Sequence, residues 1–173
     1  AGLAAARAAC RSGQTVAIFD RDALPGGKVL SAVKGLEIEG VAADLWAAEE
    51  WKALASDNLV TAKLRTTAFG LYDGGFLTAH EMPADGEIAG RVWHVRAKRI
   101  VLATGALERP MVFPGNDRPG VILSGAAEAA VGRYGVRPGQ RAVLYANHAG
   151  TEGVEAALNA AGVTVVARVG ADE

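Results

Sequence analysis

The chain has 173 residues, half of them hydrophobic, and a formal net charge of −1. This composition supplies enough apolar surface for a folded core, and the balanced charge gives no basic surface for nucleic acid or an anionic membrane. The one cysteine, Cys10, excludes an internal disulfide and a C-x-x-C redox pair. No apolar run is long enough to span a bilayer, and we expect a cytoplasmic protein.

The N-terminal segment predicts half of a βαβ unit. Residues 2–12 are rich in alanine and predict a helix that ends at Ser12-Gly13. The sequence QTVAIFD (14–20) then predicts a short strand that ends in an acidic residue. The strand that opens such a unit would precede residue 1, and we therefore expect a fragment of a longer protein, truncated at both ends.

The middle of the chain predicts a helix followed by several strands. Residues 40–58 have apolar residues at helical spacing. From 59 to 98, short apolar runs are separated by Gly74-Gly75 and by a polar turn, a pattern that predicts a small antiparallel β-meander. The sequence RIVLATG (99–105) predicts a buried strand that ends in small residues.

The C-terminal part predicts a second βαβ unit. Residues 124–135 predict a helix, and residues 138–169 predict a strand, a helix and a strand. Two such units separated by a meander indicate an α/β protein. We predict a first dinucleotide-binding domain over residues 1–109, which includes the meander. Residues 110–173 would form a connection and the start of a second, degenerate nucleotide-binding domain.

Ala1-Gly2 and Asp20 match parts of a dinucleotide-binding fingerprint. Gly2 fits the last glycine of that fingerprint because a helix follows it directly. Asp20 closes the next predicted strand, where an acidic residue binds the ribose hydroxyls of a nucleotide. The alternative is an amphipathic helix followed by a strand whose terminal aspartate is merely solvated.

Two further motifs are candidates for the same nucleotide site. Gly26-Gly27-Lys28 offers backbone amides and a cation to a phosphate. Ala103-Thr104-Gly105 leaves room for a cofactor at the carboxyl end of a strand. The simpler interpretations are a flexible turn with an exposed lysine and an ordinary strand-to-loop turn.

The second predicted βαβ unit has an incomplete fingerprint. His148, Gly150 and Gly153 occupy the G-x-G-x-x-G spacing, with a histidine in place of the first glycine. Arg168 near the end of the next strand is a candidate for the 2′-phosphate of NADP, but we expect this half to keep the fold and bind nucleotide poorly or not at all. We find no spacing typical of a metal site and expect no metal ligands and no catalytic residues in this chain.

One long segment resembles a known family. The sequence VLATGALERPMVFPGNDRPGVILSGAAEAAVGRYGVRPGQRAV (101–143) resembles the α subunit of heterotetrameric sarcosine oxidase. It is also similar to relatives in opine oxidases, hydrogen cyanide synthase and dye-linked amino-acid dehydrogenases. RTTAFGLYDGG (65–75) and Ala1-Gly2 resemble other stretches of the same family. The resemblance implies a glutathione-reductase-like fold with two dinucleotide-binding domains.

The resemblance also implies a division of labour between subunits. This region would hold NAD that is not the hydride acceptor, while a secondary amine or amino acid is oxidised at FAD on a partner β subunit, with FMN between subunits. Smaller subunits would complete the hetero-oligomer. The residues alone leave NAD, FAD and ATP open for the first site. The resemblance assigns to that site Ala1, Gly2, Asp20, Arg21, Lys28, Thr67, Ala68 and Gly105.

Two other functions fit the residues. The first is a self-contained NAD(P)H-dependent flavin reductase with FAD in the first site and NAD(P)H in the second. The missing C-x-x-C pair and His148 argue against it. The second is a scaffold subunit that binds no nucleotide.

Overall fold

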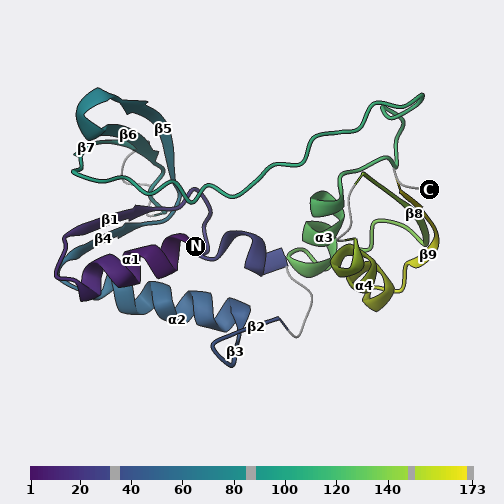
Figure 1. Cartoon of the computed structure of the whole chain (residues 1–173), viewed down its shortest axis with the longest axis horizontal. Coiled ribbons are helices and arrows are strands. Elements are labelled where there is room, and N and C mark those ends of the chain that lie inside the picture. The colour runs from purple at the N-terminus through teal and green to yellow at the C-terminus, as the bar shows by residue number, and fades with distance from the viewer. Residues whose placement is uncertain (32–35, 85–88, 148–150, 171–173) are drawn as a thin grey trace. The chain divides into compact units, whose positions relative to one another are not determined.

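The computed structural model describes residues 1–31, 36–84, 89–147 and 151–170. The chain divides into two compact units (Figure 1). Unit 1 consists of Ala1–Gly27 and Asp44–Thr104, and unit 2 consists of Lys28–Ala43 and the chain from Gly105 onward. The predicted domain bounds of 1–109 and 110–173 stay a prediction.

Unit 1 contains a parallel pair of strands covered by two helices. Helix α1 (Gly2–Arg11) leads into β1 (Val16–Phe19), which pairs in parallel with β4 (Val60–Lys63). Helix α2 (Ala43–Ala55) connects these two strands and lies with α1 along the same side of the pair (Figure 1). The helices predicted over 2–12 and 40–58 and the strand predicted over 14–20 are confirmed with shorter bounds.

An antiparallel sheet of three strands completes unit 1. Its strands are β5 (Thr66–Tyr72), β6 (Phe76–Glu81) and β7 (Arg91–Arg96), hydrogen-bonded in the order β5-β6-β7. The short 3₁₀ turn η2 (Asp73–Gly75) joins β5 to β6. We call this sheet the meander. Its predicted start was too early, because β4 pairs in parallel with β1: a long connection through a helix permits parallel pairing.

The predicted buried strand at residues 99–105 is wrong. This segment pairs with no strand among the residues that the structure describes, and the side chains of Val101 and Leu102 are 70% and 66% exposed. An apolar run becomes a buried strand only where a neighbouring strand and a covering layer meet it. The segment is therefore an extended connection.

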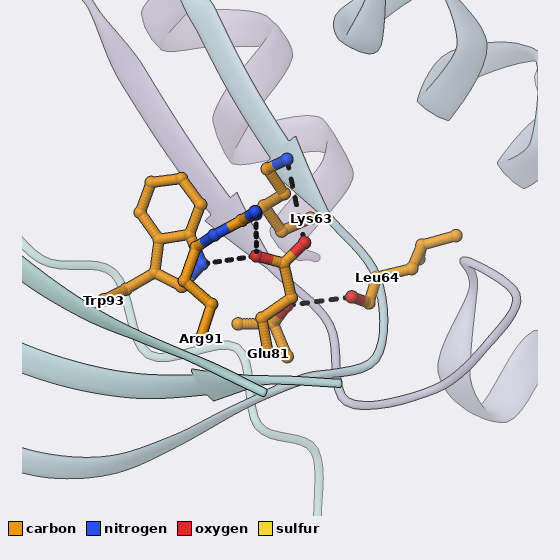
Figure 2. A network of polar contacts seen from close by, with 6 residues as sticks. Lys63, Leu64, Glu81, Arg91 and Trp93 are labelled. Atoms are coloured by element: carbon orange, nitrogen blue, oxygen red, sulfur yellow. Dashed lines mark hydrogen bonds and ion pairs between the residues drawn. The ribbon is translucent and has the colours of Figure 1, made fainter. Parts of the chain in front are cut away.

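Glu81 joins the parallel pair to the meander (Figure 2). Its side chain, 9% exposed, accepts hydrogen bonds from Nη1 of Arg91 at 2.9 Å and from Nε1 of Trp93 at 2.7 Å. Nζ of Lys63, the last residue of β4, lies 3.7 Å from its second oxygen. Burial alone would raise the pKa of Glu81, but these hydrogen bonds and the charges of Lys63 and Arg91 together lower it. The carboxylate is thus held ionised in a largely buried position.

Unit 2 is built on a second parallel pair. Strand β8 (Arg141–Ala146), helix α4 (Glu152–Ala160) and β9 (Thr164–Gly170) form a βαβ unit, and β8 pairs in parallel with β9. Helix α3 (Ser124–Gly132) packs beside α4 (Figure 1). The core of this unit is formed by Ala127, Val154, Leu158 and Val163. The predicted helix at 124–135 and the predicted unit at 138–169 are confirmed.

Three short elements complete the described chain. They are the 3₁₀ helix η1 (Gly27–Ser31) and the antiparallel strands β2 (Glu37–Ile38) and β3 (Val41–Ala42). Within unit 2, a Cβ at Gly132 would lie 2.5 Å from the backbone oxygen of Ser31. Glycine at the end of α3 therefore permits the close approach of η1.

We expect Glu81→Gln to lower the free energy of unfolding by about 2 kcal/mol at neutral pH, because Lys63 and Arg91 lose a charged partner while part of that loss is screened by solvent. Folding lowers the pKa of Glu81, so its stabilisation is complete above the ordinary value of 4.5 and is lost as the pH falls through the folded value. Urea denaturation at several pH values measures both effects. The exposed Glu49→Gln is the control; equal stability of the two variants at neutral pH would contradict the prediction.

Gly74 and Gly75 give a matched pair of substitutions in the turn η2. Both have a left-handed φ, 69° and 68°, but only at Gly75 would a Cβ meet backbone, 2.1 Å from the oxygen of Ala97. We expect Gly74→Ala to cost about 1 kcal/mol and Gly75→Ala about 2–4 kcal/mol, since the second adds a steric clash to the backbone strain. Thermal unfolding compares the two, and equal losses would show that the approach of Ala97 is unimportant.

Candidate nucleotide-binding site

The carboxyl ends of β1 and β4 form one edge of the parallel pair, and Asp20 lies at that edge. Its N–H donates to the carbonyl oxygen of Lys63 at 2.9 Å, and its own carbonyl oxygen accepts from the N–H of Thr66 at 2.8 Å. Thr67 and Ala68 follow Thr66 in β5. Backbone hydrogen bonds therefore bring Asp20 beside the segment that contains two other predicted site residues.

The side chain of Asp20 is fixed by its own turn. One carboxylate oxygen accepts a hydrogen bond from the N–H of Asp22 at 2.9 Å. A carboxylate has acceptor capacity on both oxygens, so the turn leaves Asp20 able to accept from a further donor. Arg21 is largely exposed, and its Nε lies 3.8 Å from Asp22.

Gly2 and Ala103 meet at the amino end of α1. A Cβ at Gly2 would lie 3.3 Å from the Cβ of Ala103, a tight contact. Any larger side chain at position 2 would push the connection at 103–104 away from the helix. The structure thus brings together two motifs that lie far apart in the sequence, Ala1-Gly2 and Ala103-Thr104.

The amino end of α1 and Asp20 lie at the same end of unit 1. The short segment 12–15 joins α1 to β1, so the helix and the strand run in opposite directions (Figure 1). The first N–H groups of α1 have no partner within the helix, and its first turn contains no acidic residue. These amides and the carboxylate of Asp20 are the two kinds of group that a dinucleotide needs from such a unit.

The predicted site residues are divided between the two units. Gly26 and Gly27 have φ values of 125° and 58°, which favour glycine, as a turn at that place requires. Lys28 lies in unit 2, where its charge acts on Glu108. Unit 1 contains Ala1, Gly2, Asp20, Arg21, Gly26, Gly27, Thr67, Ala68, Ala103 and Thr104, and unit 2 contains Lys28 and Gly105.

Glu108 is a polar residue that the sequence analysis did not single out. Its carboxylate accepts hydrogen bonds from the hydroxyl of Ser124 and from the N–H of Gly125, the latter at 2.9 Å. Burial alone would raise the pKa of Glu108, but these hydrogen bonds and the charge of Lys28 together lower it. Glu108 therefore places an anion at the amino end of α3. The only sequence signal was its place in the run ERPMVFPGNDR, whose contact with α3 spans 16 residues.

The second βαβ unit has acidic groups where a phosphate would bind. His148 and Gly150 lie outside the described residues, and Gly153 is in the first turn of α4 with Glu152 and Glu155. Arg168 forms an ion pair with Glu155. Carboxylates in the first turn of a helix repel an incoming anion. This arrangement is consistent with the expectation of weak nucleotide binding, which stays a prediction.

The remaining candidate chemistry is limited in the part of the chain that the structure describes. There, no three His, Cys, Asp or Glu side chains come together to hold a metal ion, and no helix has the length and hydropathy to cross a membrane. The thiol of Cys10 donates to Asp57 at 3.0 Å, and this hydrogen bond, with burial and the aspartate charge, raises the pKa of Cys10. A thiol with a raised pKa is a weak nucleophile at neutral pH.

Comparison with known proteins identifies clear relatives. The chain is 43% identical to the alpha subunit of sarcosine oxidase from Rhizobium meliloti (strain 1021) over 97% of its length, and 41% identical to the alpha subunit of the Corynebacterium sp. (strain U-96) enzyme over 82%. The predicted resemblance is confirmed. The A chain of opine oxidase from Agrobacterium tumefaciens (strain Ach5) is more distant, at 32% identity over 83% of the chain. No protein-family model matches.

The chain spans a small part of each relative. It corresponds to 18% and 15% of the two sarcosine oxidase polypeptides and to 29% of the opine oxidase polypeptide. The solved structure of L-proline dehydrogenase from P. horikoshii matches 98% of this chain and 33% of its own, with a TM-score of 0.71 and 25% identity. The α/β class with small sheets is thereby confirmed. All of these proteins are oxidoreductases by name.

Proposed function

We propose that this chain is the nucleotide-binding segment of an oxidoreductase subunit related to the alpha subunit of sarcosine oxidase. It would hold a dinucleotide while a secondary amine or an amino acid is oxidised at a flavin on a partner subunit. One observation carries the proposal: the amino end of α1, packed at Gly2 against Ala103, lies at the same end of unit 1 as Asp20. The proposed fold is the glutathione-reductase-like one with two dinucleotide-binding domains.

The amino end of α1 is the best place in the described chain for a diphosphate. Each of the other α-helices has a carboxylate at its amino end: Asp44 in α2, Glu108 against α3, and Glu152 and Glu155 in α4. Among the described helices, only α1 combines free N–H groups with small neighbours and no acidic residue in its first turn. The partial positive charge of its amino end favours an anion there.

Asp20 supports a nucleotide whose ribose keeps both hydroxyls. Its carboxylate can accept hydrogen bonds from these hydroxyls, whereas a 2′-phosphate would be repelled by the negative charge. NAD is favoured by the similarity to the alpha subunit of sarcosine oxidase, and FAD is the alternative in the same site. Thr67 and Ala68 would contact the nucleotide from β5, with Arg21, the glycines 26 and 27, Thr104, Lys28 and Gly105 completing the site.

The oxidation itself requires a redox cofactor. A flavin accepts a hydride from the C–N unit of an amine, and the protein's part is to bind and orient it. The relatives named in the comparisons are parts of oxidases, and we propose that this protein likewise assembles in the cytoplasm with smaller subunits and with a β subunit that carries FAD. Its own residues would bind nucleotide and supply no catalytic group.

We expect Asp20→Ala to weaken nucleotide retention by about 1–3 kcal/mol, or about 5- to 100-fold in affinity, because a charged hydrogen-bond acceptor is lost. Asp20→Asn keeps an acceptor for the N–H of Asp22 and should lose less. The measurement is the nucleotide released on heating from the full-length protein, purified with its partners and separated by chromatography. Asp73→Asn, an exposed carboxylate in η2, is the matched control.

Two results would contradict the proposal. The first is a wild-type assembly that contains no nucleotide apart from its flavins. The second is an Asp20→Ala variant that retains as much nucleotide as Asp73→Asn. Either result would favour a scaffold role for this segment.

A further inference from the structure

The two faces of the meander differ in chemistry. Side chains directly opposite in neighbouring antiparallel strands share a face, and successive residues alternate. The inner face carries Glu81 and Trp93, and the ring of Trp93 lies 5.9 Å from that of Phe19 in β1. The opposite face, which we call the outer face, carries Tyr72, Phe76 and Arg96 in one row and Thr78 and His94 in the next.

The outer face has an ordered cluster of aromatic and cationic side chains. The ring of Phe76 lies 5.7 Å from that of Tyr72 and 5.6 Å from that of His94. The guanidinium of Arg96 lies over Phe76 at 5.2 Å. Tyr72 is 55% exposed, and His94 and Arg96 are also exposed. Partly exposed Tyr and Arg side chains held in one geometry are the residues that most often dominate protein interfaces.

Gly70 and Thr78 hold Tyr72 in place. A Cβ at Gly70 would lie 2.6 Å from the ring of Tyr72 and 2.5 Å from the hydroxyl oxygen of Thr78. The ring therefore lies flat across the sheet at Gly70, and Thr78 is only 6% exposed. A side chain fixed in this way loses little conformational entropy when a partner binds.

Positive charge surrounds the cluster. The segment from 91 to 99 contains Arg91, Arg96, Lys98 and Arg99 and no acidic residue. Arg91 is paired with Glu81 on the inner face, whereas the other three cations form no ion pair with any residue that the structure describes. Since the whole chain has a net charge of −1, this charge is a local feature and not a general basicity.

We propose that the outer face of the meander, with Tyr72, Phe76, His94, Arg96 and Lys98, docks an acidic segment of another subunit of the assembly. Charge complementarity selects an acidic partner and suppresses others, and the aromatic rings supply the apolar contact. The relatives are named as subunits, which implies that surfaces of this kind are used. The inference rests on the proposed function in one respect, namely that the protein assembles with other subunits.

The test uses the full-length protein with its partner subunits. We expect the double variant Arg96→Glu and Lys98→Glu to weaken assembly at least tenfold, because two attractive charges become repulsive. Sedimentation at several salt concentrations measures this, and wild-type association should weaken with salt while that of the variant does not. The matched control reverses two exposed cations of unit 2, Arg137→Glu and Arg141→Glu.

A second measurement identifies the occupant of the face. A carbodiimide couples the amine of Lys98 only to a carboxylate in contact with it, and mass spectrometry then locates that carboxylate. We expect an acid-rich peptide of another subunit. Coupling to a carboxylate of the same polypeptide would overturn the inference, and so would loss of bound nucleic acid in the double variant. Unchanged assembly in the presence of these substitutions would also overturn it.

Nucleotide content separates this inference from the proposed function. Both double variants should keep the wild-type amount of nucleotide, because none of the substituted residues belongs to the proposed site. Retained nucleotide with unchanged assembly would leave the proposed function standing and the docking face refuted. If the charge reversal prevents folding, Arg96→Gln with Lys98→Gln removes the charges alone, and a several-fold loss of association is expected.

Discussion

Lys63 connects the candidate site to the buried network of unit 1, and the position of Asp20 depends on it. The backbone oxygen of Lys63 accepts the N–H of Asp20, while its side chain lies beside the carboxylate of Glu81. Glu81 in turn binds Arg91 and Trp93 from β7 (Figure 2). The edge where a nucleotide would lie is therefore fixed to the meander by a charge that is stable only while all its partners are present.

The α-helices of the described chain show how one protein separates a binding role from a structural one. An amino end that already holds a carboxylate has its partial charge satisfied, and a phosphate gains little by approaching it. Glu108 provides that carboxylate for α3 from a distant part of the sequence. The first turn of α1 lacks such a group, and small residues surround it. Binding is thus favoured at one helix end by what is missing from it.

The meander contributes through both of its faces. Its inner face holds the ionised Glu81 and packs Trp93 against β1, which positions the carboxyl edge of the parallel pair. Its outer face presents rings and cations that have no acidic neighbour in the described chain. A sheet covered on only one side commonly alternates between buried and exposed side chains in this way.

Local patterns in the sequence determined the helices 2–12, 40–58 and 124–135 and the second βαβ unit, because periodicity and capping are properties of short segments. They also indicated Gly2 and Asp20, whose spacing follows from a helix and a strand in succession. The tertiary structure decided which segments pair. It joined β4 to β1, left 99–105 without a strand partner in the described chain, and brought Glu108 to α3 and Glu81 to Lys63. Such choices depend on long-range contacts, and the same apolar or acidic residues are compatible with several partners until the chain has folded.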